Sequence, residues 1–318
     1  MSSYADLSIH RWMLRDTERN EAYRRALEHV VKPGDVVLDV GAGTGILSIF
    51  AAMAGARKVY AVERTGITEV ARQVIASNGY SDRIEVLQSD LEDLTPPEKV
   101  DVIVSEWMGG FGVDENILAP LVMARDRWLK PGGKMVPGRV TAIMAPAHLP
   151  EFDEAIAHWR SRPHGVDLSV IASLTTQETF HTQTPPESLV APPQEMWSHD
   201  PLTCSLEEAD QPFTTKLTFE TTGPSTLSGI LTWFVAEMGD GRTLTNAVGD
   251  PDTHWGRSLF PLDRPISLVA GTRVEVELCC DPSIPGNCEF SWSVKVAGHP
   301  IELHETRRAR RGRARPGS

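Results

Sequence analysis

The segment that most constrains the fold is a strand, a glycine turn and a helix near the beginning of the chain. Residues 36–40 (Val-Val-Leu-Asp-Val) form an apolar run, and the glycine turn 41–45 (Gly-Ala-Gly-Thr-Gly) and a helical stretch at 46–54 follow it. This order of elements places backbone amides and the positive end of a helix beside a bound cofactor. The spacing is GxGxG rather than the GxGxxG of dinucleotide-binding folds, and Asp39 stands where a cationic ligand could be met.

Strands and helices continue to alternate up to residue 138. A second strand at 58–63 ends in Glu63, an acid about twenty residues past the glycines that can accept both ribose hydroxyls of a ligand. Further strand patterns lie at 84–87 and 100–104, and helical patterns lie at 16–31, 68–77 and 117–129. The alternation predicts a doubly wound parallel sheet over residues 35–138, with helices in residues 1–34 ahead of it.

The pattern changes after Pro131-Gly132-Gly133. Segments rich in alternating apolar residues, separated by Gly, Pro and Asp, lie at 140–145, 213–219, 227–235, 272–280 and 289–296. They predict an antiparallel sandwich or barrel over residues 139–306. Between them, residues 152–174 are helical in pattern and residues 184–193 are rich in proline. We interpret the segment from about 152 to 185 as an excursion that contacts a second subunit.

The charge is unevenly distributed along the chain. The formal net charge is −12, but the last twelve residues carry six arginines and no acid, so residues 1–306 carry −18. An acidic body is expected to attract cationic substrates and to repel nucleic acid. The tail, residues 307–318, lacks large apolar side chains and is predicted to be disordered.

Other classes of protein are disfavoured by what the sequence lacks. No stretch approaches the roughly 18 apolar residues of a membrane span, and the first residues do not form a signal peptide, so a cytoplasmic location is expected. Of four cysteines, Cys279, Cys280 and Cys288 lie in a strand-rich region without a paired C-x-x-C or nearby histidines. Buried thiols are predicted there, with no metal site and no disulfide.

Two glutamates flank a glycine-rich stretch that follows the run 100–104. Glu106 and Glu115 lie nine positions apart, and on one helix they would be separated by roughly 13 Å along its axis, too far to share a small ligand. The glycines between them permit a loop that folds back and aims both carboxylates at one point. Two converging carboxylates suit a guanidinium, whose rigid fork of donors matches them bidentately.

These motifs, taken in order, resemble those of the protein arginine N-methyltransferases. The matching residues are Asp39 to Leu47, Glu63, Ser105 to Glu115, and Thr253-His254-Trp255, and the resemblance extends from Tyr4 to about Leu303. The glycine turn is shared by most S-adenosylmethionine enzymes, whereas the double-glutamate loop and the Thr-His-Trp loop are not generic to the fold. The resemblance implies a Rossmann-like cofactor domain, an antiparallel β-barrel, and a helical dimerisation arm matched at His158-Trp159 and Gly165 to Leu168, hence a homodimer.

Several residue roles follow from the resemblance alone. The cofactor S-adenosyl-L-methionine would be covered by the N-terminal helices and contacted by Arg19, Asp39, Gly41, Gly43, Glu63 and Glu92. Glu106 and Glu115 would be the catalytic pair, with His254 paired to Asp16. The substrate pocket would include Tyr4, Met13, Met108 and Trp255. A methionine at position 13 implies a monomethyl or asymmetric dimethyl product.

The chemistry explains why carboxylates are needed. A guanidinium nitrogen is a poor nucleophile, since its lone pair is delocalised and the group stays protonated. Glu106 and Glu115 could hold positive charge away from the attacking nitrogen and point it at the sulfonium methyl. The departing proton could go to Glu115 or through the Asp16–His254 pair. His254 could equally serve as a structural link between the N-terminal helix and the barrel.

The chain departs from the family where the substrate would bind. The family usually has Gly-Tyr-x-Leu after the tryptophan and methionine, and this chain has Gly109-Gly110-Phe111-Gly112; Ser8 also replaces a usual glycine before His10. The departures leave several substrates open: an arginine in a protein or peptide, free L-arginine, or another small guanidino compound in a bacterial biosynthetic pathway. A cofactor-binding dimeric scaffold without catalysis is the alternative from a different class.

Overall fold

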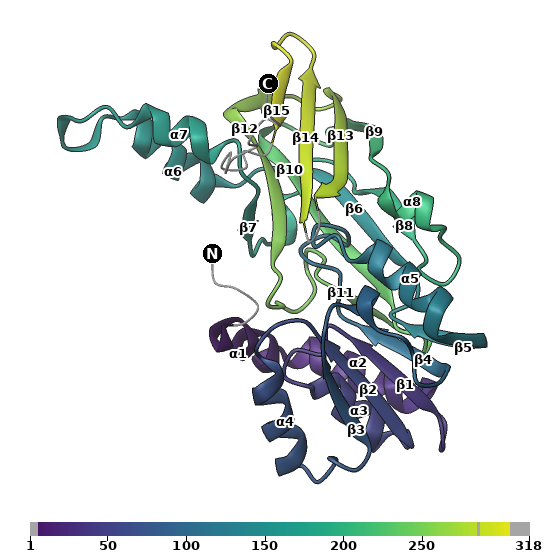
Figure 1. Cartoon of the computed structure of the whole chain (residues 1–318). Helices are drawn as coiled ribbons and strands as arrows, with labels where there is room; N and C mark the ends of the chain where they lie inside the picture. Colours follow the sequence, from purple (N-terminus) through teal and green to yellow (C-terminus); the bar gives the residue numbers. More distant parts are fainter. Residues whose placement is uncertain (1–5, 285–286, 306–318) are drawn as a thin grey trace, which may run out of the picture.

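The computed structural model describes residues 6–284 and 287–305. A helix-covered parallel sheet forms one end of the molecule, an antiparallel β domain forms the other, and a helical arm projects from the β domain (Figure 1). Within these described residues, no helix is both long and apolar enough to cross a membrane. The Arg-rich tail and Tyr4 lie outside the described residues.

The first part of the chain is a five-stranded sheet in the order β3-β2-β1-β4-β5, with every neighbouring pair parallel. Its strands are β1 (Val36–Val40), β2 (Lys58–Glu63), β3 (Ile84–Gln88), β4 (Val100–Ser105) and β5 (Leu129–Val136). The helices are α1 (Leu7–Arg15), α2 (Thr17–Val30), α3 (Ile46–Met53), α4 (Thr68–Ser77), η1 (Leu91–Asp93) and α5 (Leu118–Trp128). All five residues of β1 are buried, as expected for a central parallel strand covered on both faces.

Strand β5 was missing from the sequence-based prediction. It runs through Pro131-Gly132-Gly133, which normally marks a turn, and it begins at Leu129, which we had expected to end a helix. Its parallel pairing with β4 is irregular between Val100 and Val102. Pairing with β4 overrides the local breaker signal because proline and glycine are tolerated at the edge of a sheet.

The β domain consists of two antiparallel sheets. The first has the order β7-β12-β10-β6-β8, with β11 paired to β10, and the second has the order β15-β14-β13-β9. The strands are β6 (Val140–Ala147), β7 (Phe180–Thr182), β8 (Gln194–His199), β9 (Phe213–Glu220), β10 (Ser225–Glu237), β11 (Thr243–Thr245), β12 (Arg257–Leu268), β13 (Arg273–Ile284), β14 (Asn287–Val296) and β15 (Glu302–Glu305). Side chains from both sheets form one apolar core.

The predicted fold class, a Rossmann-like sheet followed by an antiparallel β domain, is confirmed. Strand pairing among the described residues gives two facing sheets and does not show a closed barrel. Strand β12 was missed because Pro261, Asp263 and Pro265 interrupt its apolar pattern. It nevertheless pairs with β10 along most of its length, with a register shift near Gly229, where a β-carbon would lie 2.4 Å from the carbonyl oxygen of Phe260.

The arm consists of two helices rather than one continuous pattern. It contains α6 (Pro150–Arg160), η2 (Pro163–Gly165) and α7 (Ser169–Thr175); η3 (Pro186–Ser188) and α8 (Leu206–Asp210) lie further along the chain. Phe152 and Ile156 are buried against β6, β10 and β12 of the same chain. These two residues of the excursion are therefore covered by their own chain and need no partner surface. Val166 and Val170, near the outer end of the arm, are 53% and 69% exposed.

Candidate active site

The glycine turn after β1 is tight and is covered by α1. Gly41, Gly43 and Gly45 have φ angles of +72°, +53° and +82°. Residues other than glycine rarely adopt such angles. The amide of Gly41 donates a hydrogen bond to the carbonyl oxygen of Val62, at 2.9 Å. A β-carbon on Gly43 would lie 2.9 Å from Cε1 of His10. The N-terminal helix thus rests directly on the turn.

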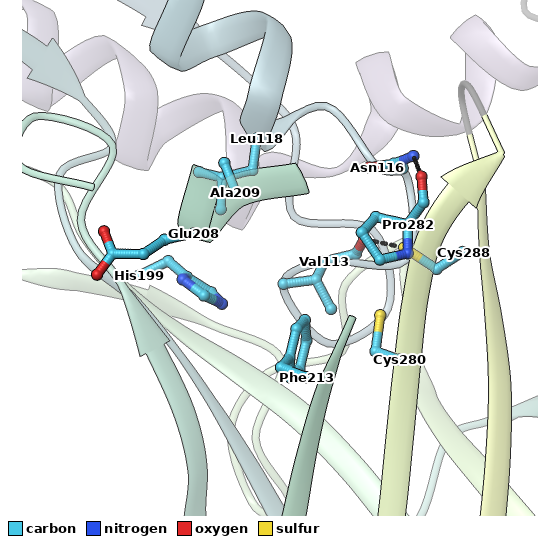
Figure 2. Close-up of a pocket in the computed structure, with 10 residues that line it drawn as sticks. All are labelled: Val113, Asn116, Leu118, His199, Glu208, Ala209, Phe213, Cys280, Pro282 and Cys288. Atoms are coloured by element: carbon cyan, nitrogen blue, oxygen red, sulfur yellow. Dashed lines mark hydrogen bonds between the residues drawn. The ribbon is translucent and has the colours of Figure 1, made fainter. Parts of the chain in front are cut away.

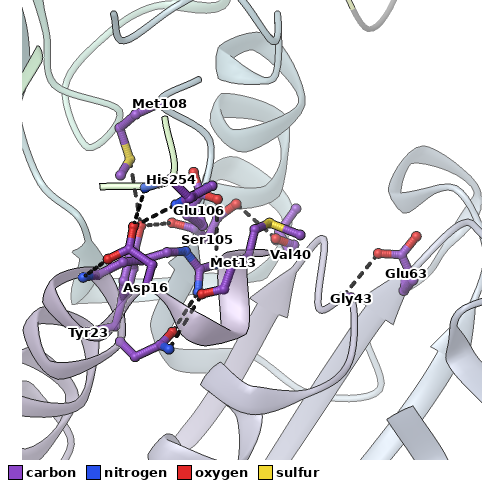
Figure 3. A network of polar contacts seen from close by, with 12 residues as sticks. Met13, Asp16, Tyr23, Val40, Gly43, Glu63, Ser105, Glu106, Met108 and His254 are labelled. Carbon is purple, nitrogen blue, oxygen red and sulfur yellow. Dashed lines mark hydrogen bonds and ion pairs between the residues drawn. The ribbon is translucent and has the colours of Figure 1, made fainter. Parts of the chain in front are cut away.

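Two predicted cofactor-binding acids follow neighbouring strands. Glu63 ends β2 and is buried. Its Oε2 accepts a hydrogen bond from the amide of Gly43 at 3.1 Å (Figure 3), and its Oε1 accepts one from the amide of Thr65 at 2.8 Å. Glu92 lies in η1, shortly after β3, and is exposed. Glu63 therefore lies at the carboxyl end of a parallel strand and Glu92 lies past one, where open α/β sheets bind ligands.

Asp39 is a fully buried acid in the central strand. Its Oδ2 accepts a hydrogen bond from Ser48 Oγ at 2.6 Å. Its Oδ1 has no hydrogen-bond partner among the described residues. Burial, only partly offset by Ser48, raises the pKa of Asp39 to about 7. A carboxylate in this position is stabilised by a cation that reaches Oδ1.

Arg19 and Glu106 form a buried ion pair between α2 and the end of β4. Arg19 Nη2 lies 3.5 Å from Glu106 Oε2, and the two side chains are only 6% and 9% exposed. Arg19 Nε and Glu106 Oε1 have no hydrogen-bond partner in the described part of the chain. Each buried polar atom without a partner costs about 1–3 kcal/mol. Asp39 Oδ1, Arg19 Nε and Glu106 Oε1 are thus three buried polar atoms that a bound polar ligand could satisfy.

Tyr23 lies at the centre of this region. Its hydroxyl donates a hydrogen bond to the carbonyl oxygen of Ser105 at 3.0 Å and lies 3.6 Å from Met108 Sδ. Burial raises the pKa of Tyr23 well above its ordinary value, and the negative charges of Glu106 and Glu115 raise it further. Both glutamates of the loop therefore act electrostatically on the same phenol.

The double-glutamate loop turns at its glycines, as the sequence predicted. Gly109 and Gly112 have φ angles of +53° and +104°. The carboxylate of Asp114 closes the turn by accepting hydrogen bonds from the amides of Gly110 at 2.9 Å and Phe111 at 3.2 Å. Among the described residues, no helix forms between β4 and α5, and the chain folds back there as a loop.

The residues that depart from the family pattern have clear positions. Phe111 is buried in the β domain, with its ring centroid 5.5 Å from that of Phe260 and 5.2 Å from that of Phe290. A β-carbon on Gly110 would lie 2.4 Å from Ser258 Oγ and 3.2 Å from His181 Cε1. The loop therefore has no space for the aromatic side chain that the family has at position 110, and β7 and β12 occupy that place.

Asp16 and His254, far apart in sequence, are in direct contact. His254 Nδ1 lies 2.7 Å from Asp16 Oδ2, and the His254 amide donates to the same oxygen at 2.8 Å. Asp16 Oδ1 also caps α2 by accepting from the Arg19 amide at 2.9 Å. Although burial opposes it, these hydrogen bonds lower the pKa of Asp16 below its ordinary value. The pair joins the N-terminal helices to the β domain.

The predicted substrate-binding residues differ in exposure. Met13 is half-buried on α1, Met108 is fully buried, and Trp255 is buried with its ring centroid 4.1 Å from that of His254. Figure 3 shows Met13, Met108 and His254 gathered around Glu106, apart from the contact between Gly43 and Glu63. Tyr4 lies outside the described residues.

Two buried polar residues near the Thr-His-Trp loop were not identified from the sequence. Arg257 Nε donates to the carbonyl oxygen of Asn246 at 2.7 Å, and Arg257 Nη1 lies 3.0 Å from Asp252 Oδ1. Arg257 directly follows Thr253-His254-Trp255-Gly256 and stands at the start of an apolar run. That position could have indicated from the sequence that its side chain is buried beside the loop. Asn246 lies in a polar segment and had the appearance of an ordinary turn residue.

A small cavity lies elsewhere, beside the base of the β domain. Val113 and Asn116 of the loop, Leu118 at the start of α5, and side chains of β8, α8, β9, β13 and β14 line it (Figure 2). None of the predicted site residues lines this cavity. Cys280 and Cys288 do, and both are buried free thiols, whereas Cys279 is partly exposed. Within the described residues, no group of three or more His, Cys, Asp or Glu side chains could hold a metal ion.

Comparisons with known proteins agree along nearly the whole chain. Residues 24–137 match the family described as ribosomal protein L11 methyltransferase, and residues 141–295 match the arginine methyltransferase oligomerization subdomain. Protein arginine N-methyltransferase 6 of Xenopus tropicalis is 36% identical over 291 residues, covering 88% of this chain and 85% of that protein. Protein arginine N-methyltransferase PRMT10 of Arabidopsis thaliana is 33% identical, covering 94% of this chain and 88% of the relative.

Solved structures give the same result. The Trypanosoma brucei PRMT1 enzyme-prozyme heterotetrameric complex with AdoHcy superposes with a TM-score of 0.86 at 29% identity, covering 96% of this chain and 100% of that chain. Arabidopsis thaliana protein arginine methyltransferase 10, in an open conformation, has a TM-score of 0.78 at 31% identity, covering 95% of this chain and 97% of that chain.

Proposed function

Because this chain belongs to the protein arginine N-methyltransferase family, it is an S-adenosyl-L-methionine-dependent arginine methyltransferase, and we propose that its substrates are arginines in proteins or peptides. The names of its relatives support protein substrates. The charge of −18 carried by residues 1–306 supports them too, since arginine-rich segments are cationic.

The site residues fit S-adenosyl-L-methionine. The methionine part of this cofactor carries an ammonium and a carboxylate, which match the carboxylate of Asp39 and the guanidinium of Arg19, two buried groups that each retain an unpartnered polar atom among the described residues. Glu63, at the carboxyl end of β2, is proposed to hold the ribose hydroxyls. Gly41 and Gly43 leave two positions of the turn without side chains, and Glu92 is proposed to lie near the adenine. When bound, the cofactor supplies an electrophilic methyl group on a sulfonium.

The catalytic assignment rests on the surroundings of the Glu106 carboxylate. Its carboxylate already lies beside a guanidinium, that of Arg19, and its Oε1 is buried without a partner in the described structure. We assign Glu106 and Glu115 to the substrate guanidinium. Two nitrogens of the substrate guanidinium donate hydrogen bonds to these carboxylates, which keeps the positive charge on those two nitrogens. The third nitrogen is then richer in electrons and is oriented toward the methyl group.

The product must lose a proton, and we propose that either of two groups takes it. Glu115 is the first. The second is His254. When the ring proton is on Nδ1 and is donated to Asp16, Nε2 can accept the proton of the product. Met13, Met108 and Trp255 are proposed to form the walls around the guanidinium, with Tyr4 at the pocket mouth.

We also propose a homodimer formed through the arm. Val166, Val170 and Ile171 are all exposed within six residues of the arm, and several apolar side chains together on a projecting element form a surface that a second copy of the chain can cover. The match of residues 141–295 to an oligomerization subdomain supports this proposal.

The decisive experiment incubates the full chain with radiolabelled S-adenosyl-L-methionine and, separately, an arginine-glycine-rich peptide and free L-arginine. Label is expected in the peptide. Glu106→Gln and Glu115→Gln should each retain cofactor binding by calorimetry and lose on the order of 100-fold or more in rate. Glu28→Gln, an exposed glutamate on α2, is the matched control. Label only in free arginine would overturn the protein substrate, and loss of cofactor binding in either variant would overturn the assigned roles.

A further inference from the structure

Asn246, just after β11, uses its whole side-chain amide to join three separate segments. It is fully buried. Its Oδ1 accepts a hydrogen bond from the Phe234 amide in β10 at 2.9 Å. Its Nδ2 donates to the carbonyl oxygen of Gly110 at 2.8 Å and also to that of Gly256.

The two carbonyl groups belong to the two loops that carry the proposed chemistry. Gly110 lies between Glu106 and Glu115, and Gly256 directly follows His254 and Trp255. We propose that Asn246 is a positioning residue that fixes these loops relative to each other for methyl transfer. This inference rests on the proposed function of Glu106, Glu115 and His254.

The glycine content of the first loop makes such a contact necessary. Glycine has more backbone freedom than any other residue, and ordering it costs more conformational entropy. Gly109, Gly110 and Gly112 have no side chains that could pack against the β domain, so the loop must be held through its backbone and through the buried side chains of Phe111 and Val113. A buried carboxamide that satisfies two carbonyl oxygens at once provides that restraint.

Asn246 is itself rigidly held. Its own carbonyl oxygen accepts a hydrogen bond from Nε of the buried Arg257, at 2.7 Å. Its Oδ1 is tied to the central strand β10 through Phe234. A buried polar network in which every group is satisfied is stiff, so the position of the double-glutamate loop is set by the β domain and not by the cofactor domain alone.

The test compares Asn246→Leu, which has a similar volume without donors, with Asn246→Ser, which is smaller and retains one donor. The matched control is Thr221→Val. Thr221 lies just after β9 and is also buried. Its hydroxyl donates a hydrogen bond to the Val269 carbonyl oxygen at 2.6 Å and accepts one from the Thr272 amide at 3.0 Å. Thermal stability, cofactor affinity, kcat and KM are measured for each full-length protein.

We expect Asn246→Leu to retain cofactor affinity and to lose on the order of 10- to 100-fold in kcat, because small displacements of catalytic groups have effects of this size. Asn246→Ser should recover part of the loss. Thr221→Val should lower thermal stability and leave kcat unchanged. In a double-mutant cycle, His254→Ala should reduce kcat less in the Asn246→Leu background than in the wild type, and equally in the Thr221→Val background.

Several results would overturn the inference. One is a kcat for both Asn246 variants equal to that of Thr221→Val, and another is strict additivity with His254→Ala. Failure of both Asn246 variants to fold would assign the residue to folding alone. If Glu106→Gln is inactive while the Asn246 variants are fully active, only the positioning role fails. If Glu106→Gln is as active as the wild type, the proposed function itself fails.

Discussion

Replacement of Asp39 by Asn should stabilise the ligand-free protein above neutral pH and weaken its binding of cofactor. Burial raises the pKa of Asp39 from 3.8 to about 7, and three pKa units correspond to about 4 kcal/mol. The folded protein keeps this proton up to about pH 7, whereas the unfolded chain loses it near pH 4. Stability of the ligand-free protein should therefore fall as the pH rises from about 4 to about 7.

The Asn variant removes this pH dependence but introduces a new donor. Its carboxamide can still accept the hydrogen bond from Ser48, but its NH2 group would face the position of Oδ1, which has no partner among the described residues. An unsatisfied buried donor costs about 1–3 kcal/mol. The net gain in the free energy of unfolding at pH 8 should then be about 1–3 kcal/mol.

Cofactor binding should change in the opposite direction. The ammonium group of the cofactor prefers an ionised Asp39, so wild-type affinity should increase as the pH rises through about 7. A charged hydrogen bond contributes about 1.5–3 kcal/mol, so Asp39→Asn should lose on the order of 10- to 100-fold in affinity and show no such pH dependence.

Thermal unfolding and calorimetric titration from about two pH units below neutrality to about one unit above it measure both effects. Asp82→Asn, an exposed acid of the same domain, should alter neither. Parallel stability curves for the wild type and Asp39→Asn over this range would refute the raised pKa. Equal cofactor affinity would refute the contact between Asp39 and the ammonium.

Three further predictions concern the cofactor turn, the arm and the product. Gly43→Ala should weaken cofactor binding measured by calorimetry, since its β-carbon would lie 2.9 Å from the His10 ring at a φ of +53°; unchanged affinity would show that α1 shifts freely. Val166→Asp combined with Val170→Asp should give a monomer by light scattering, and a dimer that persists would exclude this surface. Mass fragmentation should identify monomethyl or asymmetric dimethyl arginine, as expected from Met13, and symmetric dimethylarginine as the main species would contradict that expectation.

Local patterns in the sequence were sufficient for the main elements of the cofactor domain. The run 36–40, the glycine turn and the helix after it were recognisable because their signals lie within about ten residues, the range over which periodicity and turn chemistry act. The same holds for the fold-back of the double-glutamate loop, since its glycines act on the backbone where they stand. The resemblance to the family also implied that Asp16 and His254 form a pair.

Other features were decided by tertiary structure. Strands β5 and β12 form despite Pro131 and Pro261, because hydrogen bonding to β4 and β10 outweighs local preference. The burial of Phe152 against its own β domain also depends on the packing of distant strands.

The same distinction applies to the site. The sequence supplied the chemical types of Arg19, Glu106, Asp16 and His254, but their separations depend on where α2, β4 and the β domain meet. Asn246 had no recognisable local signal, since its hydrogen bonds reach Gly110, 136 positions away. Contacts over such separations are set by strand register and packing, which a short stretch of sequence does not encode; residue types and spacing, which it does encode, determined the family and the reaction.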